Sequence, residues 1–265
     1  MKKIIISLIA LLILTSCSTS SNDQTIKIGA SVTPHAEILE FAKDLVAEKG
    51  YTLEIVTFND YVQPNVSLED GSLDANYFQH LPYLEEFNTA RNWDLASAGK
   101  IHYEPFGLYG GRSNDLENIA DGASIGVPND GTNEGRALFL LQDLGLITLK
   151  EGTSFSATIL DIAENPKNLQ IKELEAAQLA KSLPDLDFAI INGNYALEAN
   201  LSVKDDALAL EAATSQAAET YGNVIAVRAD DVSSEKTKVL IEVLKSAKVK
   251  AWIENQYGGA GVPSN

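Results

Sequence analysis

Residues 123–145, ASIGVPNDGTNEGRALFLLQDLG, connect an apolar strand pattern to a long helical pattern through a polar turn. The apolar part ends in Pro128, Asn129 and Asp130, and residues of these types are typical of the turn after a strand. Apolar residues then recur at helical spacing as far as Gly145, a residue type that commonly ends helices. A strand followed directly by a helix is the repeating unit of α/β proteins, so this segment predicts that fold class.

The same alternation of strand and helix patterns extends along most of the chain. Further strands are predicted at 25–31, 51–58, 73–79, 169–175, 186–192 and 223–228, and helices at 33–50 and 233–255. The first helix is expected to begin at Thr33-Pro34, because proline is favoured in the first helical turn. Strands separated by helices indicate mostly parallel sheets with helices on both faces. The folded part, roughly 240 residues long, is large for one hydrophobic core and favours two lobes.

The N-terminal sequence MKKIIISLIALLILTSC has the layout of a secretory signal. Two lysines precede an apolar run over 4–14, which is too short to span a bilayer, and small residues follow it. The sequence LTSC at 14–17 resembles the bacterial lipobox, in which the cysteine is acylated. We therefore expect a signal peptide over 1–16, lipidation at Cys17 and a polar tether over 17–24. The alternative is an ordinary secreted protein with an incidental cysteine.

Charge and cysteine content exclude several classes of function. The chain carries 20 Lys and Arg against 37 Asp and Glu, a net charge of −17. Such a surface repels nucleic acid and anionic lipid head groups, so the membrane is expected to be reached through the lipid on Cys17. Cys17 is also the only cysteine, which excludes an intramolecular disulfide, a thiolate metal cluster and a catalytic thiol.

Polar residues at predicted strand ends are candidates for a ligand site, because ligands of α/β proteins bind beyond the carboxyl ends of the strands. The helix after Asp130 offers its N-terminus to an anion, with Thr132 as its expected cap and Arg136 as a planar fork for a carboxylate. Asn192 and Asn223 adjoin two further strands, and their amide oxygens can accept from an ammonium group. The alternatives are a solvated arginine and ordinary turn asparagines.

An aromatic cluster lies in residues 73–84, LDANYFQHLPYL, which contain Tyr77, Phe78, His80 and Tyr83. Such a cluster can be ordinary core, since aromatic side chains are common there. Neighbouring side chains of a strand point to opposite faces, so Tyr77 is expected outside any pocket that Phe78 lines. Together with a carboxylate-binding arginine and acceptors for an ammonium group, the cluster indicates a receptor for a zwitterion with an apolar side chain.

Five segments resemble the signature segments of the methionine-binding lipoproteins of ABC importers, the family of MetQ and NlpA. They are FNDYVQPN (58–65), LDANYFQHLPYL (73–84), VPNDGTNEGRALFLLQ (127–142), ILDIAENPKNLQIKELEAAQLAKSL (159–183) and INGNYA (191–196), and the similarity covers essentially the whole chain after the signal peptide. The resemblance implies a type II-like, two-lobed periplasmic-binding-protein fold with a hinge between the lobes. It implies ligand binding without catalysis and without a cofactor or metal.

The resemblance also implies which residues bind the ligand. They are Tyr61, Phe78, His80 and Tyr83 for a methionine side chain, Asn133 and Arg136 for the carboxylate, and Asn192 and Asn223 for the amino group. The expected lobes are 25–107, completed by 224–265, and 108–223, with crossings near 106–109 and 221–224. The implied partner is a membrane permease, and the implied location is the extracytoplasmic face of the cell membrane. D-methionine and a methionine-containing dipeptide are alternative ligands.

Three other functions are alternatives to this one. GASIG over 122–126 matches the G-x-S-x-G motif of serine hydrolases, but Ser124 is predicted at the start of a strand, and all three histidines precede it. A metal-ion receptor would depend on His35, His80 and His102, whose spacing matches no common ligand motif. A structural surface lipoprotein would share the anchor and the compact fold but would bind no solute.

Overall fold

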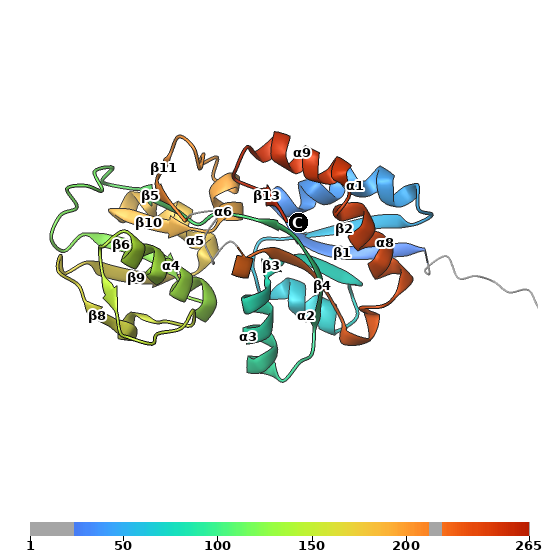
Figure 1. Cartoon of the computed structure of the whole chain (residues 1–265), viewed down its shortest axis with the longest axis horizontal. Coiled ribbons are helices and arrows are strands. Elements are labelled where there is room, and N and C mark those ends of the chain that lie inside the picture. The colour runs from blue at the N-terminus through green and yellow to red at the C-terminus, as the bar shows by residue number, and fades with distance from the viewer. Residues whose placement is uncertain (1–23, 212–218, 265) are drawn as a thin grey trace, which may run out of the picture.

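The computed structural model describes residues 24–211 and 219–264. The chain forms two lobes, each built on one β-sheet with helices packed against it (Figure 1). The predicted signal peptide, the predicted lipidation site Cys17 and nearly all of the predicted tether lie outside the described residues. Within the part that is described, no helix is long and apolar enough to cross a membrane.

The first lobe contains a six-stranded sheet. Its strands, in spatial order, are β13 (Val262–Pro263), β4 (Ala96–Tyr103), β12 (Asn223–Val227), β3 (Ala75–His80), β1 (Thr25–Ser31) and β2 (Thr52–Phe58). β1 is parallel to β2 and β3, β12 is antiparallel to β3 and β4, and β13 is antiparallel to β4. Two C-terminal strands therefore complete the sheet that the N-terminal segment begins (Figure 1).

The second lobe contains a five-stranded sheet. Its strands, in spatial order, are β11 (Ala207–Leu210), β5 (Gly107–Gly110), β10 (Phe188–Ile191), β6 (Ser124–Pro128) and β9 (Gln170–Leu174). β6 is parallel to β9 and β10, whereas β5 is antiparallel to β10 and β11. A separate two-stranded ribbon consists of β7 (Thr148–Leu149) and β8 (Ile162–Glu164).

Both sheets are mixed, so the expectation of mostly parallel sheets is wrong in this respect. β3 and β10 end at the junction between the lobes, where His80 and Asn192 line a common pocket. β5 and β12 start at this junction, because the chain enters each of them as it crosses from the other lobe. A strand that starts where its neighbour ends must run antiparallel to it, and this is the observed pairing of β12 with β3 and of β5 with β10.

Helices cover the faces of both sheets (Figure 1). In the first lobe they are α1 (Glu37–Ala47), α2 (Gln63–Glu69), α3 (Leu81–Arg91), α8 (Glu235–Leu244) and α9 (Ala247–Tyr257), with short turns η1 (Val32–Ala36) and η4 (Ala229–Asp231). In the second lobe they are α4 (Gly131–Asp143), α5 (Ala176–Ser182) and α6 (Gly193–Glu198), with η2 (Ile159–Asp161) and η3 (Leu183–Asp185). The α/β fold class expected from the sequence is confirmed.

Three predicted helix boundaries are wrong. The first regular helix begins at Glu37, because Thr33 is extended and Pro34 lies in the preceding turn η1. The C-terminal helix is two helices, and Ser246 between them caps α9 by accepting a hydrogen bond from the backbone of Val249. The cap of α4 is Asp130 and not Thr132, because the Asp130 carboxylate accepts from the backbone N–H of Asn133 at 3.0 Å.

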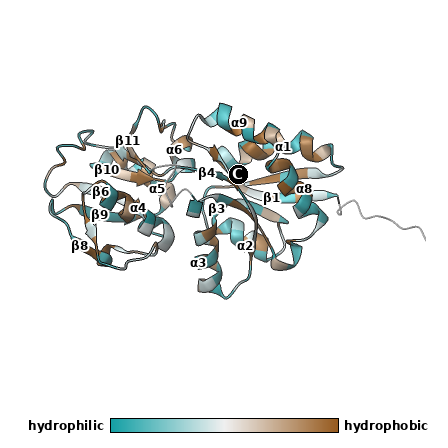
Figure 2. Cartoon of the chain, in the orientation of Figure 1, coloured by the Kyte–Doolittle hydropathy of each residue, from teal (hydrophilic) through white to brown (hydrophobic). Residues whose placement is uncertain are grey.

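Each lobe has its own hydrophobic core. In the first lobe, β1, β3 and α1 bury Ile28, Tyr77 and Leu39 in one cluster. In the second, β6 and α4 bury Val127 and Leu141 in another. Figure 2 shows hydrophobic residues gathered along the strands and on the neighbouring faces of helices such as α1. Each sheet is therefore fixed within its own lobe, and the polar ends of its strands are left to face the other lobe.

Candidate functional site: a pocket between the two lobes

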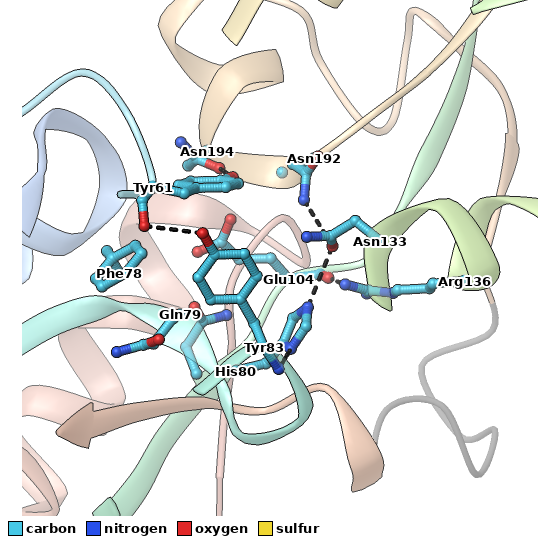
Figure 3. A pocket seen from close by; sticks show the side chains of 12 residues that line it. Tyr61, Phe78, Gln79, His80, Tyr83, Glu104, Asn133, Arg136, Asn192 and Asn194 are labelled. Atoms are coloured by element: carbon cyan, nitrogen blue, oxygen red, sulfur yellow. Dashed lines mark hydrogen bonds between the residues drawn. The ribbon is translucent and has the colours of Figure 1, made fainter. Parts of the chain in front are cut away.

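A pocket at the lobe junction is lined by residues of both lobes (Figure 3). Its lining consists of Tyr61, Phe78, Gln79, His80, Tyr83, Glu104, Asn133, Arg136, Asn192, Gly193, Asn194 and Asn223. The structure thus brings together all eight residues that the sequence analysis singled out, and it adds Gln79, Glu104, Gly193 and Asn194. Most of them lie where strands β3, β10 and β12 end or begin, as expected for an α/β protein.

Aromatic rings form one wall of the pocket (Figure 3). The ring centroid of Tyr61 lies 5.8 Å from that of Phe78 and 5.9 Å from that of Tyr83, distances typical of favourable aromatic pairs. The Tyr83 hydroxyl donates to the backbone carbonyl of Tyr61 at 2.9 Å, and the Tyr61 hydroxyl donates to Asn194 of the other lobe. Burial raises the pKa of both phenols above the ordinary range, so they remain neutral donors.

Tyr77 points away from this wall, as the alternation of β3 predicts. Its side chain is fully buried in the core of the first lobe, and its hydroxyl is hydrogen-bonded to His102 Nδ1. Phe78, the next residue, packs with Tyr83 and Phe87 in a different cluster. The predicted register of this strand is therefore confirmed.

His80 connects the two lobes through Asn133. Its Nδ1 accepts from the backbone N–H of Tyr83 at 3.2 Å, so the ring proton lies on Nε2, which donates to Asn133 Oδ1 at 3.1 Å. Burial, with Arg136 nearby, lowers the pKa of His80 to about 3, and the imidazole is neutral at physiological pH. Asn133 Oδ1 also accepts from Asn192 Nδ2 at 3.0 Å (Figure 3). One amide oxygen thus organises side chains from both lobes.

Arg136 is a buried arginine with a partner in its own lobe. Its Nε lies 3.1 Å from both carboxylate oxygens of Glu211, and its Nη2 donates to Glu211 and, at 2.8 Å, to the backbone carbonyl of Glu104. The alternative of a solvated helix arginine is therefore wrong. The sequence predicts that Arg136 holds a ligand carboxylate. In the structure, the Glu211 carboxylate already neutralises its guanidinium.

Glu104 is the functional candidate that the sequence reasoning missed. Its buried carboxylate lies 2.8 Å from His102 Nε2 and 3.3 Å from His35 Nε2, and it faces the pocket. Burial raises its pKa. A signal was present, because Glu104 is the only acidic residue in the otherwise apolar stretch 101–109, IHYEPFGLY.

The remaining asparagines of the pocket differ in their hydrogen bonding. Asn223 Oδ1 lies 3.1 Å from His35 Nε2. Asn192 Oδ1 and Asn194 Nδ2 are buried without a hydrogen-bond partner among the described residues. Buried polar atoms of this kind are normally satisfied, so an acceptor and a donor at a pocket wall indicate a polar ligand.

The pocket is narrow. Its cavity volume is about 20 Å³, far below the roughly 300–1,000 Å³ of small-molecule sites. The side chains of Tyr61 and Tyr83 take up part of the space between the lobes. A ligand the size of an amino acid can therefore enter only if the lobes or these side chains move apart.

The structure also bears on the hydrolase and metal alternatives. Ser124 begins strand β6, and its hydroxyl donates to Asp187 at 2.8 Å, so it is not at the strand-to-helix turn that a nucleophile requires. The spacing of the histidines matches no common ligand motif, but the fold brings His35 and His102 together. With Glu104 they place three ligand atoms within 4.8 Å of one another.

Two α/β lobes with a polar and aromatic pocket at their junction define a two-lobed solute-binding protein. The model of the NlpA lipoprotein family matches residues 26–265, so the chain belongs to this family. It is 40% identical over 274 residues to the methionine-binding lipoprotein MetQ of Bacillus subtilis (strain 168), with 99% of each chain covered.

Solved structures of solute-binding proteins share this fold. A nutrient binding protein from Burkholderia cenocepacia, bound to methionine, is 45% identical with a TM-score of 0.86, covering 91% of this chain and 100% of that one. A periplasmic substrate-binding protein of an ABC transporter from Coxiella burnetii is 43% identical with a TM-score of 0.85, covering 90% and 100%. The two-lobed fold expected from the sequence is thereby confirmed.

Proposed function

We propose that this chain is the solute-binding lipoprotein of an ABC importer and that it binds methionine in the pocket between its lobes. Membership of the NlpA lipoprotein family and the methionine-bound relative support this function. The observation that carries it is the division of the pocket into an aromatic wall and a polar wall, which matches the two parts of an amino acid with an apolar side chain.

The aromatic wall is assigned to the methionine side chain. A thioether is polarisable and gains about 0.3–1.5 kcal/mol from each contact with an aromatic ring. Tyr61, Phe78 and Tyr83 offer three rings within about 6 Å of one another. His80 is neutral and adds a fourth ring without adding charge.

The polar wall is assigned to the amino-acid backbone of the ligand. Asn133 and Arg136 supply donors for its carboxylate, and Asn192 and Asn223 supply acceptors for its amino group. The donors come from α4 in the second lobe, while Asn223 belongs to the first-lobe sheet. A ligand held by the α4 donors of the second lobe and by Asn223 of the first therefore favours the closed arrangement of the lobes.

The lobes expected from the sequence are 25–107 with 224–265, and 108–223, with crossings near 106–109 and 221–224. We propose boundaries one residue earlier, because Gly107 begins β5 of the second sheet and Asn223 begins β12 of the first. Closure around methionine gives the permease a surface to recognise, and no catalytic step is involved. We further propose that Cys17 carries the lipid and holds the protein at the extracytoplasmic face of the cell membrane.

Thermal unfolding of the purified protein tests this function directly. L-methionine, D-methionine and a methionine-containing dipeptide are compared, with glutamate as the control because its side chain is charged. A ligand that binds only the folded state stabilises it by about 2.7 kcal/mol at one hundred times its Kd. If no methionine compound raises the melting temperature, the proposal is wrong and a structural surface lipoprotein is favoured. Mass spectrometry of any co-purified ligand distinguishes amino acid from dipeptide.

A further inference from the structure

Glu104 is a buried carboxylate without a cationic side chain as its partner in the described part of the chain. Its side chain is 5% exposed, and within residues 24–211 and 219–264 no lysine or arginine comes within ion-pair distance of its carboxylate. Arg136 approaches only the backbone carbonyl of Glu104, and its own charge is neutralised by Glu211. Buried charges are normally paired, so this carboxylate calls for a positive partner.

The two histidines beside Glu104 provide dipoles and not charge. Burial lowers the pKa of His35 to about 4 and that of His102 to about 3, so both rings are neutral at physiological pH. His102 Nε2 donates to Glu104 at 2.8 Å while the Tyr77 hydroxyl donates to its Nδ1. These contacts fix the position of the carboxylate but leave its charge uncompensated.

The position of Glu104 also depends on a glycine. A Cβ atom at Gly193 would lie only 2.7 Å from Glu104 Oε2 and from Glu104 Cβ. The carboxylate can therefore lie directly against the start of α6, next to Asn192. Asn192 Oδ1 is a buried acceptor without a partner among the described residues. Asn223 Oδ1 lies in the same pocket and is 3.1 Å from His35 Nε2, but a carbonyl oxygen can accept a second hydrogen bond.

We propose that Glu104 is the counter-charge for the α-ammonium group of the ligand, and that it selects ligands with a free amino group over ligands without one. The inference rests on the proposed function and adds a residue and a selectivity to it. An ammonium group has three donors, and Glu104, Asn192 and Asn223 present three acceptors. Ammonium also supplies the positive charge that Glu104 lacks.

A metal ion is the competing occupant, because two imidazoles and a carboxylate are a common zinc ligand set. The position of Glu104 in the ligand pocket favours the ammonium group, since a metal ion held there would displace the ligand. Methionine affinity measured before and after dialysis against EDTA separates the two. Unchanged affinity supports the ammonium, and any change of affinity, in either direction, that added Zn²⁺ reverses overturns the proposal.

The main experiment combines a substitution of Glu104 with removal of the amino group from the ligand. Calorimetry measures the binding of L-methionine and of 4-(methylsulfanyl)butanoate, which lacks the amino group, to the wild-type protein and to Glu104→Gln. We expect the wild-type protein to prefer methionine by about 100-fold, and Glu104→Gln to lose about 30-fold in methionine affinity. The variant should bind the butanoate at least as tightly as the wild type does, because a negative charge has been removed from the pocket.

Glu134→Gln is the matched control. Like Glu104, Glu134 is a buried glutamate, but it belongs to α4 of the second lobe, its carboxylate accepts from the backbone of Ile159, and it does not line the pocket. It should leave both affinities unchanged. Glu104→Gln should also raise the melting temperature without ligand, because an uncompensated buried charge has been removed.

The outcomes distinguish a failure of the proposed function from a failure of the role assigned to Glu104. A wild-type protein that binds no methionine overturns the proposed function and this inference with it. A wild-type protein that binds methionine and the butanoate equally overturns the inference alone, and this comparison needs no variant to fold. Equal methionine affinity of the wild type and Glu104→Gln also overturns it alone.

Discussion

His80 of the first lobe donates a hydrogen bond to Asn133 of the second lobe, with 3.1 Å between His80 Nε2 and Asn133 Oδ1. The same oxygen accepts from Asn192, so one amide group joins the end of β3 to the end of β10. The hydrogen bond across the junction and the polar wall of the pocket therefore depend on one side chain. Under the proposed function, this residue would couple lobe closure to ligand binding.

Asn133→Ala removes this coupling and should favour the open arrangement of the lobes. We expect methionine affinity to fall about tenfold, since the closed form and one ligand contact are both weakened. Small-angle X-ray scattering of the variant with methionine should show a larger radius of gyration than the wild type. Asn118→Ala, an exposed asparagine that is hydrogen-bonded only to Asp115, is the control. If Asn133→Ala binds methionine as tightly as the wild type does, the hydrogen bond between His80 and Asn133 does not contribute to ligand binding.

Tyr83 lines the pocket and Tyr77 lies in the core of the first lobe, so substitutions of the two residues should have different effects on ligand affinity and on stability. Tyr83→Ala should lower methionine affinity at least tenfold, about 1.4 kcal/mol, and should lower the ligand-free melting temperature by only a few degrees. Tyr77→Ala should cost about 3–5 kcal/mol of folding free energy, because the ring is fully buried in the first core. It should lower affinity less than Tyr83→Ala does, because Tyr77 reaches the pocket only through His102 and Glu104. Calorimetry and thermal unfolding of both variants give the result, and the reverse pattern would refute the assignment of β3 to the pocket wall.

The success of the sequence analysis at β3 and its failure at Glu104 have physical causes. The opposite directions of Tyr77 and Phe78 and the strand-end position of Asn192 could be predicted because strand alternation and strand ends are local properties. Tyr83 lies on α3, and its place in the pocket was implied by the family resemblance. His35 and Glu104 meet only through the fold, as do Arg136 and Glu211, which lie 75 residues apart. The antiparallel strands at the junction escaped prediction for the same reason, since their direction depends on where the chain crosses between lobes.

Cys17 is expected to anchor the protein to the membrane. Cys17→Ala should leave the folded lobes intact, because the residue lies before the first strand, which starts at Thr25. The variant should move from the membrane fraction to the soluble fraction, or accumulate with its signal peptide uncleaved. Fractionation with immunoblotting measures both. A variant that is processed and partitions like the wild type would rule out the lipid anchor.

Buried neutral histidines should make the protein less stable as the pH falls. In the unfolded chain a histidine binds a proton near pH 6.5, whereas burial lowers the folded pKa of His35 to about 4 and of His80 to about 3. Between these values the unfolded state binds more protons, so the free energy of unfolding decreases from pH 7 towards pH 4. Glu104 has a raised pKa and contributes with the opposite sign below that pKa.

His80→Asn isolates one histidine in this pH dependence. The ligand-free melting temperature is measured at pH 7, 6 and 5 for the wild type and the variant. The decrease between pH 7 and pH 5 should be smaller in the variant, because one group that takes up a proton on unfolding is missing. Parallel curves would mean that His80 is protonated in the folded protein as readily as in the unfolded chain.

The ion pair of Arg136 and Glu211 leads to opposite effects for its two members. Arg136→Ala leaves Glu211 buried without a partner, which should destabilise the protein and weaken methionine binding by about 2–5 kcal/mol, because the ligand carboxylate then meets an unpaired negative charge. Glu211→Gln leaves the guanidinium without a counter-ion, and the ligand carboxylate can take that place. We expect methionine to bind about three- to tenfold more tightly to this variant, although its ligand-free stability should fall.

Calorimetry and thermal unfolding of Arg136→Ala and Glu211→Gln show whether Glu211 orients the guanidinium of Arg136 or competes with the ligand carboxylate for its charge. Arg112→Ala is the matched control, since Arg112 forms an exposed ion pair with Asp187 at 3.0 Å and should affect neither measurement by more than about 1 kcal/mol. If Glu211→Gln weakens binding as much as Arg136→Ala does, the pair acts as one unit that orients the guanidinium. Tighter binding would instead show that Glu211 competes with the ligand carboxylate for the charge of Arg136.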